Sequence, residues 1–407
     1  MSKNLLSFEE ALQRLLDGAH PVTHCEQVPT QAALGRVLAQ GLRSSIDVPP
    51  LDNTSMDGYA VRCADLDSPG ATLEIAQRIA AGSVGHTLAA GTAARIFTGA
   101  PVPAGADAVV MQEVCAIEHG KLTVDHVPKP GEWIRRRGED IATGAEVLAA
   151  GTCLRPQELG LAASVGAANL TVFRRLKVAL FSTGDELAMP GEPLKPGGIY
   201  NSNRTTLHAL LQGLGCEVSD FGIIPDRLDA TRAVLREAVA GHDLILTSGG
   251  VSVGEEDHVK PAVEAEGKLD LWKIAIKPGK PLAFGSVRND SNGAAFIGLP
   301  GNPVSSFVTF LMLVRPFIRR AQGVHGVLAT VPRGQRLRAG FDWRGDPRRE
   351  FIRARINADG DLELFPNQSS GVLTSCVWSD GLIDNPPGCT IAVGDLVRFI
   401  PFCELLS

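Results

Sequence analysis

The sequence predicts a multidomain α/β plus β protein, with a central three-layer α/β domain built on a parallel sheet. Over residues 176–322, apolar runs of strand length alternate with amphipathic helical patterns, which is typical of a parallel sheet covered by helices on both faces. Short β-like runs separated by Pro and Gly occupy residues 45–140 and 328–407 and predict two β-rich domains. The length of 407 residues allows two to four domains, each with its own core.

The N-terminal region carries helical signals on both sides of the first β-rich segment. Ser7 and Glu10 have the spacing of a capping box ahead of an apolar stripe. Pro156 begins an Ala-rich helical pattern that continues to about Ala168. We therefore predict a helical N-terminal domain that is interrupted by the β-rich one. The predicted domains are 1–44 with 141–175 (elongated N-terminal), 45–140 (inserted β-rich), 176–327 (α/β) and 328–407 (C-terminal small β).

Individual elements follow from the same patterns. Asn203 is the expected N-cap of the first helix in the α/β domain. The strands expected in this domain cover residues 176–181, 218–224, 244–246 and 294–297, and the helices cover 205–214, 229–239 and 304–320. The strands expected in the two β-rich domains cover 94–97, 108–111 and 122–124, and then 351–356, 362–365 and 396–400.

Composition excludes several classes of function. The net charge is −6, from 39 basic and 45 acidic side chains, and aromatic residues make up 5%, so neither a nucleic-acid surface nor an anionic-membrane surface is indicated. No apolar run has the length of a membrane span, and the N-terminus has no signal core. The eight cysteines are scattered without a Cys-x-x-Cys pair, which argues against zinc and disulfides. These features predict a soluble, cytoplasmic protein.

Polar clusters follow the predicted strands of the α/β domain. Glu186, Asp226 and Asp257 each come shortly after a strand, and residues 298–303 follow another. Because the carboxyl ends of parallel strands meet at one edge of a sheet, we expect these loops to line one crevice. A single such acid is most often a helix cap or a turn former. Their joint recurrence instead favours a magnesium or phosphate site, since a cation removes the repulsion between clustered carboxylates.

Residues 242–260 contain the most informative of these clusters. An apolar run leads into Ser248-Gly249-Gly250, and Glu255, Glu256 and Asp257 follow. A strand that ends in glycines before a helix leaves backbone N–H groups free to face an anion. Nearby carboxylates are explained if a divalent cation bridges them to phosphate oxygens. This chemistry predicts an enzyme or a carrier of a phosphorylated ligand.

Three lysines could supply positive charge to the same crevice. Lys273 and Lys277 are an even number of residues apart, so on one extended strand they would point to the same face. The Lys277-Pro-Gly-Lys280 turn has a charge at each end and suits an oxyanion. The alternative is a solvated lysine pair on a surface hairpin. Asp57 and Thr98 lie in polar turns that identify no function by themselves.

Taken together, these segments closely resemble the molybdopterin molybdenumtransferase family (MoeA, and the E domain of gephyrin and its plant relatives). Any one matching segment would be weak, but the set runs in family order over most of the chain. The α/β domain is then of the molybdopterin-binding type. The matching segments are residues 53–62, 96–103, 137–140, 182–187, 200–203, 248–257, 273–281 and 300–305.

The resemblance implies an elongated homodimer of four-domain subunits. Its active cleft would lie between the α/β domain of one subunit and the β-rich insertion of the other. The implied reaction is the last step of molybdenum cofactor assembly, in which adenylylated molybdopterin and molybdate, with Mg²⁺, give the cofactor and AMP. A molybdopterin adenylyltransferase and receiving molybdoenzymes are possible partners.

The resemblance also implies roles for individual residues. The implied catalytic residues are Asp57, Thr98, Glu186, Asp226, Asp257, Lys273 and Lys277, and the implied metal ligands are Glu186, Asp226 and Asp257. The implied substrate-binding residues are Asn201, Ser202, Asn203, Ser248, Gly249, Gly250, Ser252, Pro300 and Pro303. The implied molybdate residues are Lys277, Lys280, Ser305, Arg353 and Ser370. Family members often have a small residue and an aromatic around Asp257, whereas Glu256 and His258 flank it here.

Two other functions compete with this interpretation. An adenylyltransferase uses a similar α/β domain to activate molybdopterin with ATP, but that domain alone would form a single compact unit. The long N-terminal region with Asp57 and Thr98 favours molybdenum insertion, and Asp57 would help to place the attacking group across the dimer interface. A non-enzymatic scaffold is the second rival, although it would not need the acids and lysines together.

Overall fold

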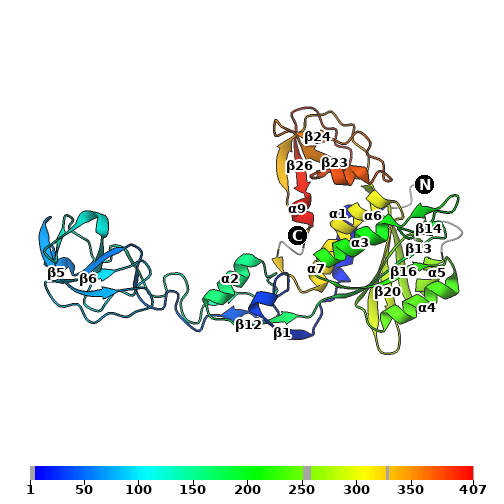
Figure 1. The fold of residues 1–407 in the computed structure, drawn as a ribbon. Coiled ribbons are helices and arrows are strands. Elements are labelled where there is room, and N and C mark those ends of the chain that lie inside the picture. Colours follow the sequence, from blue (N-terminus) through cyan, green and yellow to red (C-terminus); the bar gives the residue numbers. More distant parts are fainter. Residues whose placement is uncertain (1–4, 251–257, 327–329, 407) are drawn as a thin grey trace.

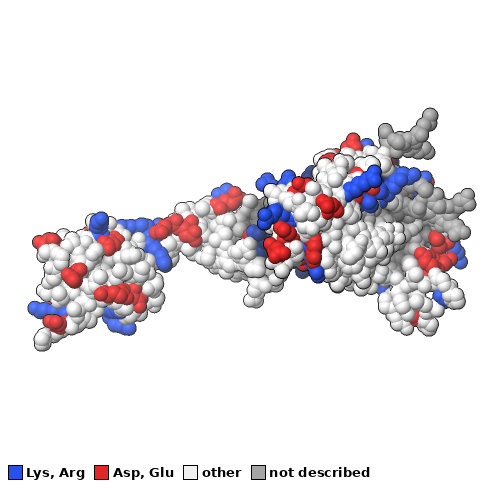
Figure 2. Space-filling view, turned by 90° about the horizontal axis from the view of Figure 1, so that it is seen from above, with Lys and Arg blue, Asp and Glu red and all other residues white. Residues whose placement is uncertain are grey.

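The computed structural model describes residues 5–250, 258–326 and 330–406. Figure 1 shows an elongated molecule with a β-rich unit at one end and the α/β and C-terminal units at the other. A narrow segment that contains α2 (Pro156–Ser164) connects the two ends. On the face seen in Figure 2, basic and acidic side chains are interspersed along the length of the molecule. Within the described residues, none of the helices has the length and apolar character that a membrane crossing requires.

Helix α1 (Phe8–Asp17) begins at the predicted capping box. The Ser7 amide donates to Glu10 Oε2 at 2.9 Å, and the Glu10 amide donates to Ser7 Oγ at 3.1 Å. Its apolar face, which includes Phe8 and Leu15, is buried in the core that also contains the α/β unit. This packing places the first helix beside the sheet, at the opposite end of the molecule from the β-rich unit.

Two distant stretches of chain run together through the narrow segment. β1 (Cys25–Pro29) pairs antiparallel with β12 (Asn169–Phe173), and β2 (Leu42–Arg43) pairs antiparallel with β11 (Glu146–Leu148). These strands and α2 bury a small core of their own around residues such as Leu154. The chain therefore leaves towards the β-rich unit and returns from it along the same path.

The β-rich unit contains a six-stranded sheet in the order β7-β4-β6-β5-β9-β8. The strands are β4 (Gly58–Val61), β5 (Ala71–Ile79), β6 (Thr92–Ile96), β7 (Ala108–Met111), β8 (Cys115–Glu118) and β9 (Lys121–Val124). A short pair, β3 (Asn53–Thr54) and β10 (Ile134–Arg135), lies at its base. The three predicted strands of this region are confirmed. Gly58 is needed at the start of β4, because a Cβ there would lie 1.9 Å from the Val110 carbonyl oxygen.

The α/β unit is built on a six-stranded sheet in the order β16-β13-β17-β21-β20-β18. The four strands that pair in parallel are β16 (Glu217–Ile224), β13 (Lys177–Thr183), β17 (Leu244–Ser248) and β21 (Gly293–Leu299). The predicted parallel core is thus confirmed. Two antiparallel strands, β20 (Pro281–Arg288) and β18 (Gly267–Lys273), extend the sheet, which makes it mixed.

Helices cover both faces of this sheet, as a three-layer domain requires. One face buries residues of α1, α3 (Ser202–Gly213), α6 (Pro303–Thr309) and α7 (Arg315–Ala321), and the other buries residues of α4 (Leu228–Val239) and α5 (Val259–Glu266). The predicted helix over 304–320 contains a wider turn, η4 (Phe310–Val314), between α6 and α7. The predicted N-cap of α3 is wrong. Helix α3 starts earlier, and Asn201 Oδ1 accepts from the Arg204 amide at 3.0 Å.

The C-terminal unit has its own sheet, in the order β19-β23-β25-β26-β22, with β24 paired to β23. Its strands are β22 (Gln335–Arg338), β23 (Arg349–Ile356), β24 (Leu362–Leu364), β25 (Gly381–Asn385) and β26 (Leu396–Pro401), and the helices are α8 (Thr374–Trp378) and α9 (Phe402–Leu405). The three predicted strands are confirmed. β19 (Ile276–Lys277) comes from the α/β region of the chain and pairs parallel with β23.

Phe351 on β23 of the C-terminal unit packs in the core that also contains α1 and one face of the α/β unit. Its side chain is fully buried, and its ring meets that of Phe8 edge to face at 5.5 Å. We expect Phe351→Ala to lower the free energy of unfolding by roughly 3 to 5 kcal/mol, through lost burial and a cavity. Denaturant unfolding of both variants would measure this loss. The control is Val377→Ala, because Val377 is 86% exposed and should change stability by at most about 0.5 kcal/mol. Equal unfolding midpoints for the two variants would contradict the expectation.

Candidate active site

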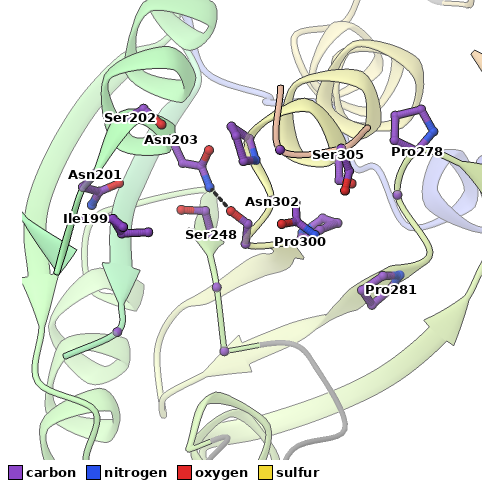
Figure 3. Close-up of a pocket in the computed structure, with 18 of the residues that line it drawn as sticks. Ile199, Asn201, Ser202, Asn203, Ser248, Pro278, Pro281, Pro300, Asn302 and Ser305 are labelled. Atoms are coloured by element: carbon purple, nitrogen blue, oxygen red, sulfur yellow. Dashed lines mark hydrogen bonds between the residues drawn. The ribbon is translucent and has the colours of Figure 1, made fainter. Parts of the chain in front are cut away.

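A cleft of about 1050 Å³ lies at the carboxyl ends of the parallel strands (Figure 3). Each of the four loops expected at this edge contributes to its lining, through residues such as Glu186, Asp226, Ser248 and Pro300. The predicted shared crevice is therefore confirmed. The C-terminal unit supplies another wall through Arg348 and residues 368–371.

The glycine turn after β17 lines the cleft. Gly249 and Gly250 have φ values of 89° and 63°, which favour glycine. A Cβ on Gly249 would also lie 2.8 Å from the Thr183 carbonyl oxygen, so this turn packs directly against the end of β13. The Gly249 amide donates to the Leu299 carbonyl at 3.1 Å, which ties the turn to β21.

The residues that follow this turn in the chain lie outside the described residues. They include four positions singled out in the sequence: Ser252, Glu255, Glu256 and Asp257. Ser252 was predicted to bind substrate and Asp257 to be a catalytic metal ligand, and both assignments stay predictions.

The acids Glu186 and Asp226 come from neighbouring strands and line the same cleft. The Asp226 amide donates to Asp185 Oδ1 at 3.3 Å, which links the two loops that carry them. Gly184 leaves room for the Glu186 carboxylate, because a Cβ at this glycine would lie 2.6 Å from it. Within residues 5–250, 258–326 and 330–406, no three His, Cys, Asp or Glu side chains form a group that could hold a metal.

This donor set nevertheless fits magnesium. In phosphate-processing sites Mg²⁺ is commonly held by one or two carboxylates together with substrate phosphates and water, without a complete protein cage. Glu186 and Asp226 both line the cleft and have the hard carboxylate oxygens that such an ion prefers. They could hold the ion with a phosphorylated ligand completing its coordination.

The segment Asn201–Asn203 forms the start of α3 and another part of the cleft wall. Asn203 Nδ2 donates to the Gly301 carbonyl at 2.7 Å, shown as the dashed line in Figure 3. This bond fixes the start of α3 against the turn that follows β21. Pro300 lies on that turn, Pro303 begins α6 directly after it, and both line the cleft.

Lys277 lines the cleft within a network of charged groups. Its Nζ lies 3.1 Å from Glu350 Oε1 and 3.4 Å from Asp346 Oδ2. Arg348 also bonds Asp346 through its Nε and Nη2, both at 3.0 Å, and these bonds hold the pKa of Asp346 well below its usual range. Glu350 is only 2% exposed, so Lys277 supplies the charge that compensates a buried carboxylate.

Three other predicted molybdate residues, Lys280, Ser305 and Ser370, also line the cleft, whereas Arg353 does not. Arg353 is 1% exposed, and burial lowers its pKa to about 10. Its guanidinium donates to the Ser369 carbonyl at 3.3 Å and to Ser375 Oγ at 3.2 Å. Arg353 therefore lies behind the loop that carries Ser370.

Lys273 is exposed at the end of β18, where it pairs with Pro281 of the cleft wall, but it does not itself line the cleft. The expectation that Lys273 and Lys277 share one strand is wrong, because Lys277 lies on β19 and pairs with the other sheet. The chain turns between them at Ile274 and Ala275. The even spacing consequently says nothing about a common face.

Asp57 directly precedes β4 and Thr98 comes shortly after β6, so both belong to the β-rich unit, which lies at the opposite end of the molecule from the α/β unit (Figure 1). Asp57 Oδ1 accepts from the Thr98 amide at 2.8 Å and from Thr98 Oγ1 at 2.7 Å. These two bonds lower the pKa of the Asp57 carboxyl. Within a single chain, this pair is remote from the cleft.

The cleft thus gathers most of the predicted residues. The predicted residues in its lining are Glu186, Asn201, Ser202, Asn203, Asp226, Ser248, Gly249, Gly250, Lys277, Lys280, Pro300, Pro303, Ser305 and Ser370. Sequence reasoning missed Arg348, Gln368 and Ser369, which come from the C-terminal unit. The run of charges over residues 342–350 was a signal that could have directed attention to Arg348.

Comparison with known protein families accounts for three successive parts of the chain. Residues 6–166 match "MoeA N-terminal region (domain I and II)", residues 179–320 match "Probable molybdopterin binding domain", and residues 336–402 match "MoeA C-terminal region (domain IV)". The matched segments follow the order of the units seen in the structure.

Individual relatives extend over most of the chain. A molybdopterin molybdenumtransferase of Haemophilus influenzae is 45% identical over 321 residues, 78% of each chain. One from Nostoc is 37% identical over 376 residues, 90% of this chain and 86% of the relative. The crystal structure of a molybdopterin biosynthesis MoeA protein from Pyrococcus horikoshii is 30% identical, covers 98% of this chain and 99% of its own, and gives a TM-score of 0.78. The chain therefore belongs to the molybdopterin molybdenumtransferase family.

Proposed function

We propose that this protein inserts molybdenum into adenylylated molybdopterin, using molybdate and Mg²⁺, and releases AMP and the molybdenum cofactor. The observation that carries the proposal is one cleft with carboxylates (Glu186, Asp226) and lysines (Lys277, Lys280) in its lining. The names of the relatives support the class of reaction. The enzyme would be a transferase in the last step of cofactor assembly, working in the cytoplasm.

The acidic and the basic residues of the cleft would have different roles. Magnesium held by Glu186 and Asp226, with Asp257 as a further candidate, would neutralise charge on the phosphate oxygens of the ligand. Lys277 and Lys280 would bind oxyanions on the C-terminal side of the cleft. Molybdate is a tetrahedral dianion, for which ammonium and hydroxyl donors are suited, so Ser305 and Ser370 would complete its pocket.

A second copy of the chain would complete the site. Asp57 and Thr98 lie too far along the elongated molecule to join the cleft of their own chain. In a homodimer with crossed subunits, the β-rich unit of each copy would reach the cleft of the other. Asp57, held as a carboxylate by Thr98, would there help to place the attacking group.

The reaction itself is tested with purified protein, adenylylated molybdopterin, molybdate and Mg²⁺. We expect AMP and active cofactor to form in equal amounts, and neither to form when molybdate or Mg²⁺ is omitted. A parallel incubation with ATP and molybdopterin tests the adenylyltransferase rival. Accumulation of adenylylated molybdopterin there, without AMP release in the first assay, would overturn the proposal.

The role of the acids is tested by Glu186→Gln and Asp226→Asn, which keep side-chain size while removing a charge. We expect each variant to need roughly tenfold more Mg²⁺ for half-maximal AMP release, because a neutral amide is a weaker ligand for a hard cation. The control is Asp290→Asn on an exposed turn, which should leave the Mg²⁺ dependence unchanged. Identical magnesium curves for all three variants would contradict the assignment.

The shared site is tested by mixing two impaired chains, at a Mg²⁺ concentration too low to support Glu186→Gln alone. Asp57→Asn and Glu186→Gln are co-expressed with different tags, and the mixed dimers are compared with each variant alone. In a mixed dimer one cleft is doubly altered and the other is intact, so dimers isolated through both tags should show roughly half of wild-type activity. Activity no higher than that of the separate variants would show that both residues act within one chain.

A further inference from the structure

Arg95 contacts residues that flank Asp57 and Thr98 in the β-rich unit. It lies on β6, and its guanidinium carbon is 5.1 Å from the centre of the Tyr59 ring and 4.6 Å from that of Phe97. Its Nη1 donates to the Gly58 carbonyl at 2.9 Å, and its Nη2 donates to Gln112 Oε1 at 2.6 Å. One planar cation is therefore fixed by two rings and two hydrogen bonds.

Each of these contacts is adjacent to the Asp57–Thr98 pair. Gly58 follows Asp57 in the chain, and Phe97 precedes Thr98. Gln112 also lies next to the pair, because its backbone amide donates to the Asp57 carbonyl at 3.1 Å. Arg95 thus binds the Gly58 backbone and the Gln112 side chain next to the pair, and among the described residues it makes no hydrogen bond to the Asp57 carboxylate itself.

We propose that Arg95 is a positioning residue that holds the Asp57 carboxylate and Thr98 at the geometry needed in the partner cleft. The inference rests on the proposed function, since it requires Asp57 to act there. Arg95 works through Asp57 and makes no contact with the ligand. A displacement of about 1 Å in such a group lowers the rate of a reaction by up to about 100-fold, which is why its anchoring matters.

Arg78 is a matched control for Arg95, because it contacts the same Phe97 ring. It stacks on Phe97 at 4.5 Å, nearly the distance of Arg95, and it is exposed. Among the described residues, no hydrogen bond or ion pair joins its guanidinium to the Asp57 turn. Loss of Arg78 removes a stacked cation from Phe97 but leaves the links to Gly58 and Gln112 in place.

The test compares Arg95→Met, Arg95→Lys and Arg78→Met for AMP release and for thermal unfolding. We expect Arg95→Met to lower kcat by about 10- to 100-fold while KM for adenylylated molybdopterin stays within about twofold. Arg95→Lys keeps the charge but cannot make both hydrogen bonds, so it should recover part of kcat. Arg78→Met should stay within about twofold of the wild type in both constants.

Mixed dimers separate positioning from general damage to the β-rich unit. Mixed dimers of Arg95→Met with Glu186→Gln, isolated through two different tags, should show roughly half of wild-type activity, because one cleft then receives an intact Arg95 from its partner. No restoration would overturn the proposal, as would equal losses in Arg95→Met and Arg78→Met.

The controls also distinguish this inference from the proposed function. A wild-type protein that releases no AMP refutes the reaction. A wild-type protein that is active, with Asp57→Asn equally active, refutes the role of Asp57. An inactive Asp57→Asn beside a fully active Arg95→Met refutes the positioning role alone.

Discussion

The parallel pairing of β19 with β23 is the constraint on which the cleft depends. It brings the C-terminal unit over the edge of the α/β sheet, so that Arg348 and residues 368–371 face the loops that follow the parallel strands. The same pairing places Lys277 beside the buried Glu350 carboxylate. Removing Lys277 would leave the buried Glu350 carboxylate without its ion pair, so a side chain that lines the cleft also joins the two units.

The long, narrow segment has the opposite effect, because it keeps the β-rich unit away from the cleft of its own chain. Two antiparallel strand pairs and a small core hold together the stretch of chain that leads to the β-rich unit and the stretch that returns from it. The segment therefore acts as a spacer. The Asp57–Thr98 pair is held rigidly at the end of this spacer, by hydrogen bonds of its own and by the contacts of Arg95 with the adjacent backbone. This is the arrangement that the proposed site shared between two copies of the chain requires.

Local patterns predicted most elements and the edge of the sheet where the site lies. Polar loops after four predicted strands were enough to locate the site, because the carboxyl ends of parallel strands lie at the same edge of a sheet. The patterns failed where long-range pairing decides the outcome. Lys273 and Lys277 have the spacing of one strand, but they belong to different sheets. The Arg353 side chain is of a type that often binds anions, yet the fold buries it behind the Ser369 backbone.

The sequence by itself determined the family, the succession of domains and the identity of the acids and lysines, because these depend on local periodicity and on motifs that keep their order along the chain. Only the tertiary structure decided which of those side chains meet. It added Arg348 to the cleft, removed Arg353 and Lys273 from its lining, and separated Asp57 from it by the length of the molecule. Contacts between residues far apart in the chain arise from sheet pairing and unit packing, which no short stretch of sequence encodes.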